Sequence, residues 1–151
     1  MTDIVTIDIG GTHARFAIAS ICDHGTISRS EPNTLTTQDH ASFQSAWEAF
    51  RTLHGGTLSD GVAMAIAGPL NSDLIRFTNN PWSIQPAKIA PELKVKHHTI
   101  INDFAAVAHA VAHCDPAHFL HLAGPDGALP SIGATTVLGP GTGLGVALLL
   151  R

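Results

Sequence analysis

The sequence predicts an α/β domain in which helices pack on a mixed β-sheet. Apolar runs typical of strands alternate with segments of helical period in the order β-β-β-α-β-α-β-α. Hydrophobic residues make up 44% of the 151 residues and charged residues only 13%, so the chain can bury a substantial core. This length predicts one domain or slightly more.

The chain is predicted to begin with two strands joined by a glycine turn. Residues 3–9 and 14–21 are rich in β-branched and apolar side chains, and the GGTH between them has the composition of a turn. Residues 26–36 are predicted to supply a third, more polar strand.

A helix is predicted next, because apolar side chains recur at positions i, i+3, i+4, i+7 and i+10. These side chains are Phe43, Ala46, Trp47, Phe50 and Leu53. Gly55 and Gly56 are expected to end the helix. Trp47 and Phe50 are therefore expected in the core.

The rest of the chain is predicted to alternate strands and helices and to close on a second hairpin. We expect strands at 60–67, 73–77 and 97–103, a short helix at 86–93, a longer helix at 103–113, a loop at 114–133 and a strand, glycine turn and strand at 135–151. We place a domain boundary near residues 113–117. Residues 1–113 would then form a small N-terminal domain, and residues 114–151 a linker and the start of a second, truncated domain.

Charge and composition exclude several classes of protein. The net charge of −4 argues against a nucleic-acid partner, which needs a basic face. There is no apolar run long enough for a transmembrane helix, and the N-terminus lacks the basic region of a signal peptide. Cys22 and Cys114 are too few for a disulfide framework. We therefore expect free thiols and a cytoplasmic protein without a membrane partner.

The first glycine turn, in TIDIGGTHAR, has two interpretations. A Gly-Gly pair is often an ordinary hairpin turn. Here, however, Asp8 precedes it, and a magnesium ion bound through water would reconcile that carboxylate with a phosphate. Thr12 offers a hydroxyl, and the glycines allow backbone N–H groups to approach a phosphate closely. A strand follows the turn, so it is neither a Walker A loop nor a dinucleotide fingerprint.

A second glycine-rich stretch, GPGTGLG at 139–145, precedes an apolar strand. Its spacing does not match the G-x-G-x-x-G fingerprint. By itself it is equally a flexible hairpin. Two such turns in one chain could hold one polyphosphate from two sides.

The stretch IINDFAAV places Asn102 and Asp103 where a predicted strand gives way to a helix. This is a frequent place for ligand contacts in open α/β sheets. Asp103 is either an N-terminal helix carboxylate or a general base that accepts the proton of a substrate hydroxyl. Asn102 offers both a donor and an acceptor, which suits sugar hydroxyls.

The histidines His109 and His113 are four residues apart on the predicted helix, with Cys114 beside them. This spacing occurs in zinc sites. Because no HExxH glutamate lies between them, solvent-facing histidines are the preferred interpretation.

Together these stretches resemble the bacterial glucokinase family, within the actin-like, hexokinase-type ATPase superfamily. The matching segments are DIGGTHAR at 8–15, AIAGP at 65–69, TNNPW at 78–82, IINDFAAV at 100–107 and GPGTGLGVA at 139–147. They occur in the family's order and span nearly the whole chain. One such motif is weak evidence, but five in register are strong.

The resemblance implies an actin-like ATPase (RNase H-like) fold, with the first hairpin of a second domain. It implies ATP-dependent phosphorylation of glucose on its 6-hydroxyl, with Mg²⁺ offsetting the phosphate charge. By the resemblance the ATP phosphates are held by Asp8, Ile9, Gly10, Gly11, Thr12, Gly141, Thr142 and Gly143, with Asp8 also facing the metal. The sugar is bound by Asn102, Asp103, Thr78 and Asn79, with Asp103 as the base. Residues 67–69 would shape the backbone of the cleft.

The chain departs from the family in three respects. His13 stands where the family usually has asparagine, and Pro140 stands where alanine is common. Family members are also roughly twice as long as this chain. We therefore expect an N-terminal fragment with weak activity or none. The alternatives are a non-catalytic sugar- or nucleotide-binding remnant, a kinase for another hexose, and a site assembled by pairing of two chains as a homodimer.

Overall fold

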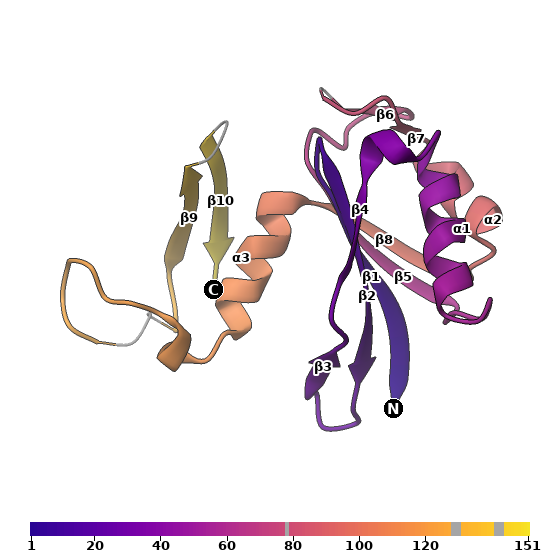
Figure 1. Cartoon of the computed structure of the whole chain (residues 1–151). Coiled ribbons are helices and arrows are strands. Elements are labelled where there is room, and N and C mark those ends of the chain that lie inside the picture. The colour runs from indigo at the N-terminus through magenta and orange to yellow at the C-terminus, as the bar shows by residue number, and fades with distance from the viewer. Residues whose placement is uncertain (78, 128–130, 141–143) are drawn as a thin grey trace. The chain divides into compact units, whose positions relative to one another are not determined.

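The structure, a computed structural model, describes residues 1–77, 79–127, 131–140 and 144–151 (Figure 1). Its contacts divide the chain into two compact units, Met1–Asp103 and Phe104–Arg151. The elements are β1 (Thr2–Ile9), β2 (His13–Ile21), β3 (Ile27–Arg29), β4 (Asn33–Thr36), η1 (Thr37–Asp39), α1 (Phe43–Leu53), β5 (Gly61–Ile66), β6 (Ile75–Arg76), β7 (Ser83–Ile84), η2 (Pro86–Lys88), α2 (Ile89–Leu93), β8 (His97–Asn102), α3 (Asp103–His113), η3 (Pro116–His118), β9 (Ala134–Pro140) and β10 (Leu144–Leu150).

A mixed sheet forms the centre of the first unit. Within the described residues it has six strands in the order β3-β2-β1-β5-β8, with β4 also pairing with β2. Strands β1, β5 and β8 are parallel, whereas β2 is antiparallel to β1. This arrangement of a mixed sheet with helices confirms the predicted fold class.

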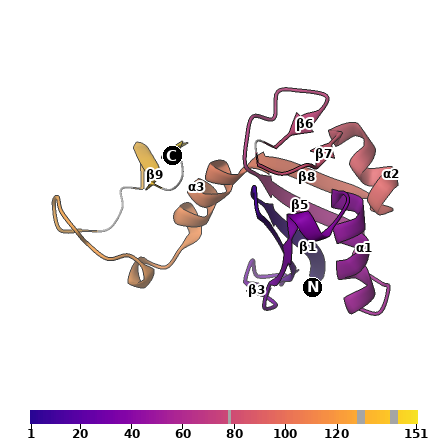
Figure 2. The same cartoon turned by 45° about the horizontal axis from the view of Figure 1, so that its top comes forward.

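The core lies between one face of the sheet and helices α1 and α2, which Figures 1 and 2 show on the same side of the strands. Alternate residues of β1 and β5 are buried, as period-two strands require. Helix α1 contributes four of its apolar residues, including Trp47 and Phe50, and Phe50 stacks on Phe16 at 5.2 Å between ring centroids. The predicted core positions of Trp47 and Phe50 are therefore confirmed. A capping box between Ser42 and Ser45 fixes the start of the helix.

Helix α1 ends at Leu53, which is 65% exposed. One detail of the predicted elements was wrong. The third strand expected over residues 26–36 is two short strands, β3 and β4, which pair with different parts of β2. Pro32 lies between them and has no N–H to donate to a continuous ladder.

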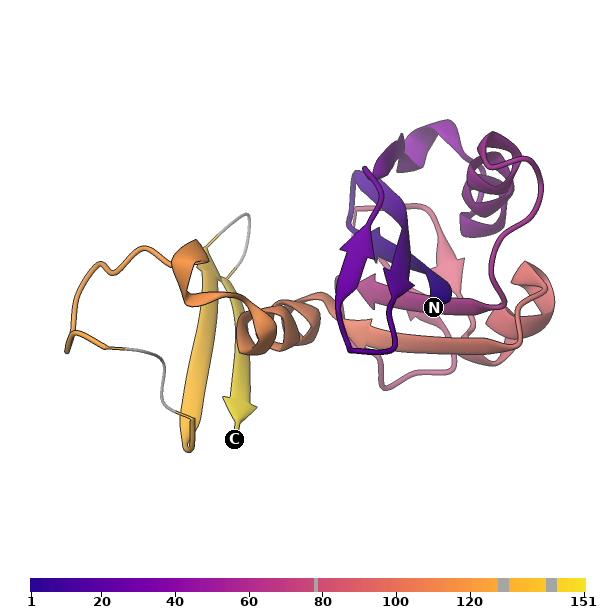
Figure 3. The ribbon, with the colours of Figure 1, turned by 90° about the horizontal axis from the view of Figure 1, so that it is seen from below.

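The second unit consists of α3, η3 and the β9–β10 hairpin, and Figure 3 shows the two strands side by side. The division between the two units falls between residues 103 and 104, earlier in the chain than the domain boundary expected at 113–117. The expected domain boundary stays a prediction. No helix in the described part of the chain has the length and apolar character to cross a bilayer.

Candidate active site

The carboxyl ends of the three parallel strands lie side by side at one edge of the sheet. The register pairs Ile9 with Ile66, and Ile66 with Asn102. Because adjacent strands are spaced about 4.8 Å apart, Ile9 and Asn102 lie roughly 10 Å apart across β5. The fold therefore brings the turn at residues 8–12 and the pair at 102–103 to the same edge.

The first glycine turn is hydrogen-bonded to Thr37, a fully buried polar residue. The Thr37 hydroxyl lies 3.1 Å from the carbonyl oxygens of both Gly11 and Thr12. The backbone N–H of Thr37 donates to Thr12 O at 2.9 Å. Gly10 N–H closes the turn by donating to His13 O at 2.9 Å. With these bonds made, the N–H groups of Gly11 and Thr12 have no partner among the described residues. Such unpaired N–H groups in a tight turn are what an anion needs.

The loop at residues 79–82 lies against the same turn. Asn80 is buried, its Nδ2 donates to Gly10 O at 3.3 Å, and its Oδ1 accepts from Trp82 N at 2.9 Å. A Cβ on Gly11 would lie 3.2 Å from the Cβ of Asn79. The structure thus places the predicted sugar ligand Asn79 beside the predicted phosphate turn. Thr78 lies outside the described residues.

Asn80 was not predicted to belong to the site, although the local sequence pattern around it indicated a structural role. Asn80 precedes Pro81 and Trp82, and asparagine often accepts from the N–H two residues ahead in an Asx turn. That pattern predicts a structural role for Asn80, and the contact with Gly10 adds a role at the turn.

Asp8 forms an ion pair with Arg15, a residue that was not predicted from the sequence. The strand register places Asp8 opposite Arg15, and Arg15 Nη1 donates to Asp8 Oδ2 at 3.0 Å. Both side chains are about half exposed. The signal was the hairpin itself, because strands joined by a turn at residues 10–12 bring positions 8 and 15 together. The carboxylate and a guanidinium therefore lie together where the turn begins.

Asn102 and Asp103 occupy the end of β8 and the start of α3. Asn102 Nδ2 donates to Gly68 O at 3.3 Å, which holds the connection after β5 against the end of β8. Gly68 has a φ of +136°, a conformation that favours glycine. Asp103 is half-buried in the first helical turn, where the helix dipole favours a carboxylate.

The second glycine stretch has a packing role at two of its positions. Gly139 and Gly145 are opposite one another in the β9–β10 pair, and a Cβ on either would overlap the Phe104 ring. These two glycines are therefore explained by the aromatic ring that lies on them. The expected phosphate ligands Gly141, Thr142 and Gly143 lie outside the described residues.

The described residues hold no group of three or more His, Cys, Asp or Glu side chains placed to bind a metal ion. Asp8 is a single half-exposed carboxylate beside the turn. One carboxylate suits Mg²⁺, which keeps several waters and takes its remaining ligands from substrate phosphates. The donor set is therefore compatible with magnesium bound together with a nucleotide.

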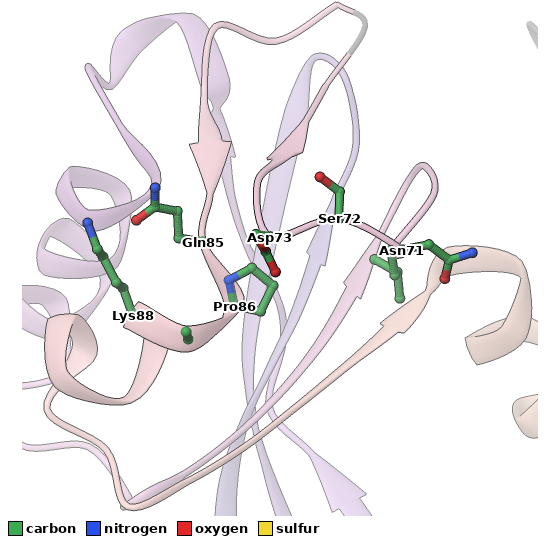
Figure 4. Close-up of a pocket in the computed structure, with 8 residues that line it drawn as sticks. Asn71, Ser72, Asp73, Gln85, Pro86 and Lys88 are labelled. Carbon is green, nitrogen blue, oxygen red and sulfur yellow. The ribbon is translucent and has the colours of Figure 1, made fainter.

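A separate hollow of about 830 Å³ lies between the β5–β6 connection and η2. Figure 4 shows Asn71 and Ser72 on one side of it and Gln85 and Lys88 on the other, with Asp73 between them. None of the expected site residues that the structure describes lines this hollow. It is therefore distinct from the edge formed by the ends of β1, β5 and β8.

Comparison with known proteins decides the family. A family model described as glucokinase matches residues 5–151. The chain belongs to the glucokinase family. A glucokinase from Zymomonas mobilis subsp. mobilis is 52% identical over 149 residues, which are 99% of this chain and 46% of that relative. A glucokinase from Paramagnetospirillum magneticum is 36% identical over 150 residues, which are 97% of this chain and 44% of the relative.

A solved glucokinase structure from an Antarctic psychrotroph has the same fold. Its TM-score is 0.87 at 27% identity, and the match covers 100% of this chain and 47% of that one. The chain thus spans about half the length of the curated and solved glucokinases that it matches. The predicted resemblance to the N-terminal half of a glucokinase is confirmed.

Proposed function

We propose that this chain supplies the nucleotide-phosphate and sugar contacts of a glucokinase, which transfers a phosphoryl group from ATP to the 6-hydroxyl of glucose. The observation that carries the proposal is the register that aligns Ile9, Ile66 and Asn102. It brings a donor-rich turn and a carboxylate to one edge, with a spacing that suits a phosphate beside a sugar. Membership of the glucokinase family supports the choice of ATP and glucose.

In this proposal the residues of the edge have separate tasks. The N–H groups of Gly11 and Thr12 and the Thr12 hydroxyl bind phosphate oxygens. Asp8 holds Mg²⁺ through water, and the ion supplies neutralisation of the phosphate charge. Asn102 orients the sugar hydroxyl, and Asp103 accepts its proton as the phosphoryl group moves.

Binding without efficient turnover is the outcome that we expect for the 151-residue chain alone. The chain covers 46% of its Zymomonas relative, so more than half of that enzyme has no counterpart in it. Phosphoryl transfer depends on positioning and on excluding water, which one side of a site does poorly. A kinase for another hexose and a non-catalytic binding remnant are the alternatives. Turnover with a panel of sugars tests the first, and binding of glucose or ATP with no turnover favours the second.

The test is glucose-dependent ADP production by the purified chain with Mg²⁺ and ATP, alongside Asp103→Asn. Asp73→Asn is the matched control, because Asp73 lies in the hollow of Figure 4 and the variant makes the same change of charge. Calorimetric titration with glucose and with Mg·ATP gives binding independently of turnover. Activity or sugar binding lost only in Asp103→Asn supports the proposal. Measurable activity that is equal in both variants, or binding of neither substrate, would overturn it.

Pairing of two chains is a further proposal that the same assay addresses. If a homodimer completes the site, specific activity rises with chain concentration and follows the dimer fraction measured by sedimentation. A specific activity that is constant while the dimer fraction changes would contradict it.

A further inference from the structure

The sequence contains two Asp–Gly steps, Asp60–Gly61 and Asp126–Gly127. An aspartate followed by glycine is prone to spontaneous isomerisation, because glycine has no side chain to hinder attack by its own backbone nitrogen. The attack requires the peptide bond and the carboxyl group of the aspartate to turn toward each other. The contacts around each step therefore decide whether it reacts in the folded chain.

The first step, Asp60–Gly61, is fixed where β5 begins. The Asp60 carbonyl accepts from the backbone N–H groups of Lys96 and His97, at 2.9 and 3.0 Å. The Asp60 carboxylate is paired with Lys96 Nζ at 2.6 Å. A Cβ on Gly61 would lie 3.1 Å from Cγ2 of Ile4, so the glycine is packed against β1. Turning the peptide or the carboxyl group at this step breaks these contacts.

The second step, Asp126–Gly127, is open. The Asp126 side chain is fully exposed, and its Oδ1 lies 3.4 Å from Nδ1 of His121, which is also exposed. Contacts between exposed groups of this kind contribute little. The Asp126 carbonyl and the Gly127 N–H make no backbone hydrogen bond with a described residue. Apart from its chain neighbours, no described atom lies within 4 Å of the position of a Cβ on Gly127. The step is therefore free to reach the geometry of ring closure.

We propose that Asp126 is a site of spontaneous isomerisation to isoaspartate in the folded chain, and that the fold protects Asp60. The Gly127 nitrogen attacks Cγ of the protonated Asp126 carboxyl group and forms a C–N bond. The carboxyl hydroxyl and the amide proton leave together as water, which gives a cyclic imide. Water then opens the imide at the α-carbonyl of Asp126, so the main chain runs through Cβ and Cγ. No atom is oxidised or reduced, and water is the only other reactant.

The product differs from aspartate in a way that a second protein can recognise. The main chain gains one methylene group, and the free carboxylate moves to the α-carbon. The chemical class of partner is an enzyme that methylates this α-carboxylate with S-adenosylmethionine. The step shares no residue with the candidate active site, so the proposal does not depend on the kinase function.

Peptide mapping of the incubated native chain tests the proposal. The chain is kept at mildly acidic pH and digested, and the peptides are separated by chromatography with mass detection, because isoaspartate changes retention but not mass. Methyl transfer by an isoaspartate methyltransferase labels the same peptide independently. We expect isoaspartate to form at residue 126 at least about tenfold faster than at residue 60, because reaction at residue 60 requires the strand end to open locally.

The same chain unfolded in guanidinium chloride is the matched control. Both steps should then react at similar rates, because the contacts that hold Asp60 are gone. In the native chain, Asp126→Glu should remove the labelled peptide and leave residue 60 unchanged, since glutamate has to close a larger ring that forms more slowly. A native chain with no more isoaspartate at residue 126 than at residue 60 would overturn the proposal.

Discussion

Asp8 and Arg15 face one another across the first hairpin, with Arg15 Nη1 3.0 Å from Asp8 Oδ2. Both side chains are about half exposed, and such pairs contribute only about 0–1 kcal/mol to stability. Stability alone is therefore a poor explanation for a charge pair at the start of a glycine turn. The ligand proposed for that turn gives both groups a purpose, because a guanidinium binds phosphate directly and a carboxylate can hold the Mg²⁺ that accompanies the phosphate.

The first prediction concerns Asp8→Asn. If Asp8 holds Mg²⁺ through water, the variant should lose the magnesium dependence of ATP binding, with Mg·ATP affinity falling about tenfold or more. Binding of ATP without magnesium should be unchanged or tighter, because a negative charge near the phosphates has gone. Titration calorimetry with and without Mg²⁺ measures both.

Asp3→Asn is the matched control for this prediction. Asp3 lies on the same strand and accepts from Ser20 Oγ at 2.6 Å, at the opposite end of β1 from the turn. It should bind Mg·ATP as the unmodified chain does. Equal magnesium dependence in Asp8→Asn and the unmodified chain would remove Asp8 from the metal site.

The second prediction concerns Thr37→Val, which keeps the shape of the side chain and removes its hydroxyl. The carbonyl of Gly11 loses its contact with that hydroxyl, and Thr12 O keeps only the Thr37 N–H. The cost should be about 1–3 kcal/mol in the free energy of unfolding, because a buried acceptor is left unpaired. Mg·ATP should also bind more weakly, since the turn is less well held.

Thr36→Val provides the comparison for Thr37→Val. Thr36 is the preceding residue, is half-buried in β4, and makes no side-chain hydrogen bond with a described residue. We expect a change within about 0.5 kcal/mol in urea denaturation. If both variants cost the same, Thr37 does not have the role at the turn assigned here.

The third prediction separates the two asparagines of the loop beside the turn. Asn80→Asp removes the Nδ2 donor to Gly10 O and places a carboxylate against that carbonyl, so it should cost about 1–3 kcal/mol. Asn79→Ala changes an exposed residue and should leave stability nearly unchanged, while weakening glucose binding. Urea denaturation and glucose titration of each variant measure these effects. A stable Asn80→Asp variant would contradict the assignment.

Local patterns in the sequence were sufficient for most of the elements and for the edge of the sheet. The apolar spacing of α1 predicted the burial of Trp47 and Phe50, and the strand ends predicted where Asp8 and Asn102 would lie. Arg15 was within reach of the same reasoning, because hairpin register alone places it opposite Asp8.

Other parts of the site depend on contacts between distant residues. Thr37 contacts a turn 25 residues before it, and Asn80 contacts Gly10 from 70 residues away. Neither pairing leaves a local pattern, because a buried threonine resembles any other strand or turn threonine until the fold brings its partner close. The same holds for Gly139 and Gly145. From the sequence alone, these glycines fit a phosphate-binding turn as well as they fit close packing against the Phe104 ring.

The fourth prediction tests the packing of Gly145 against the Phe104 ring. Gly145→Ala should destabilise the β9–β10 hairpin by about 1–3 kcal/mol, because the added methyl group overlaps the Phe104 ring. Amide hydrogen exchange of the β9 and β10 strands measures the loss locally. Phe104→Ala removes the ring, so adding Gly145→Ala to that background should cost little, and the double-mutant cycle should give a coupling of at least about 1 kcal/mol. Additive costs in the cycle would show that Gly145 is required for another reason, and its glycine would again be open to the phosphate interpretation.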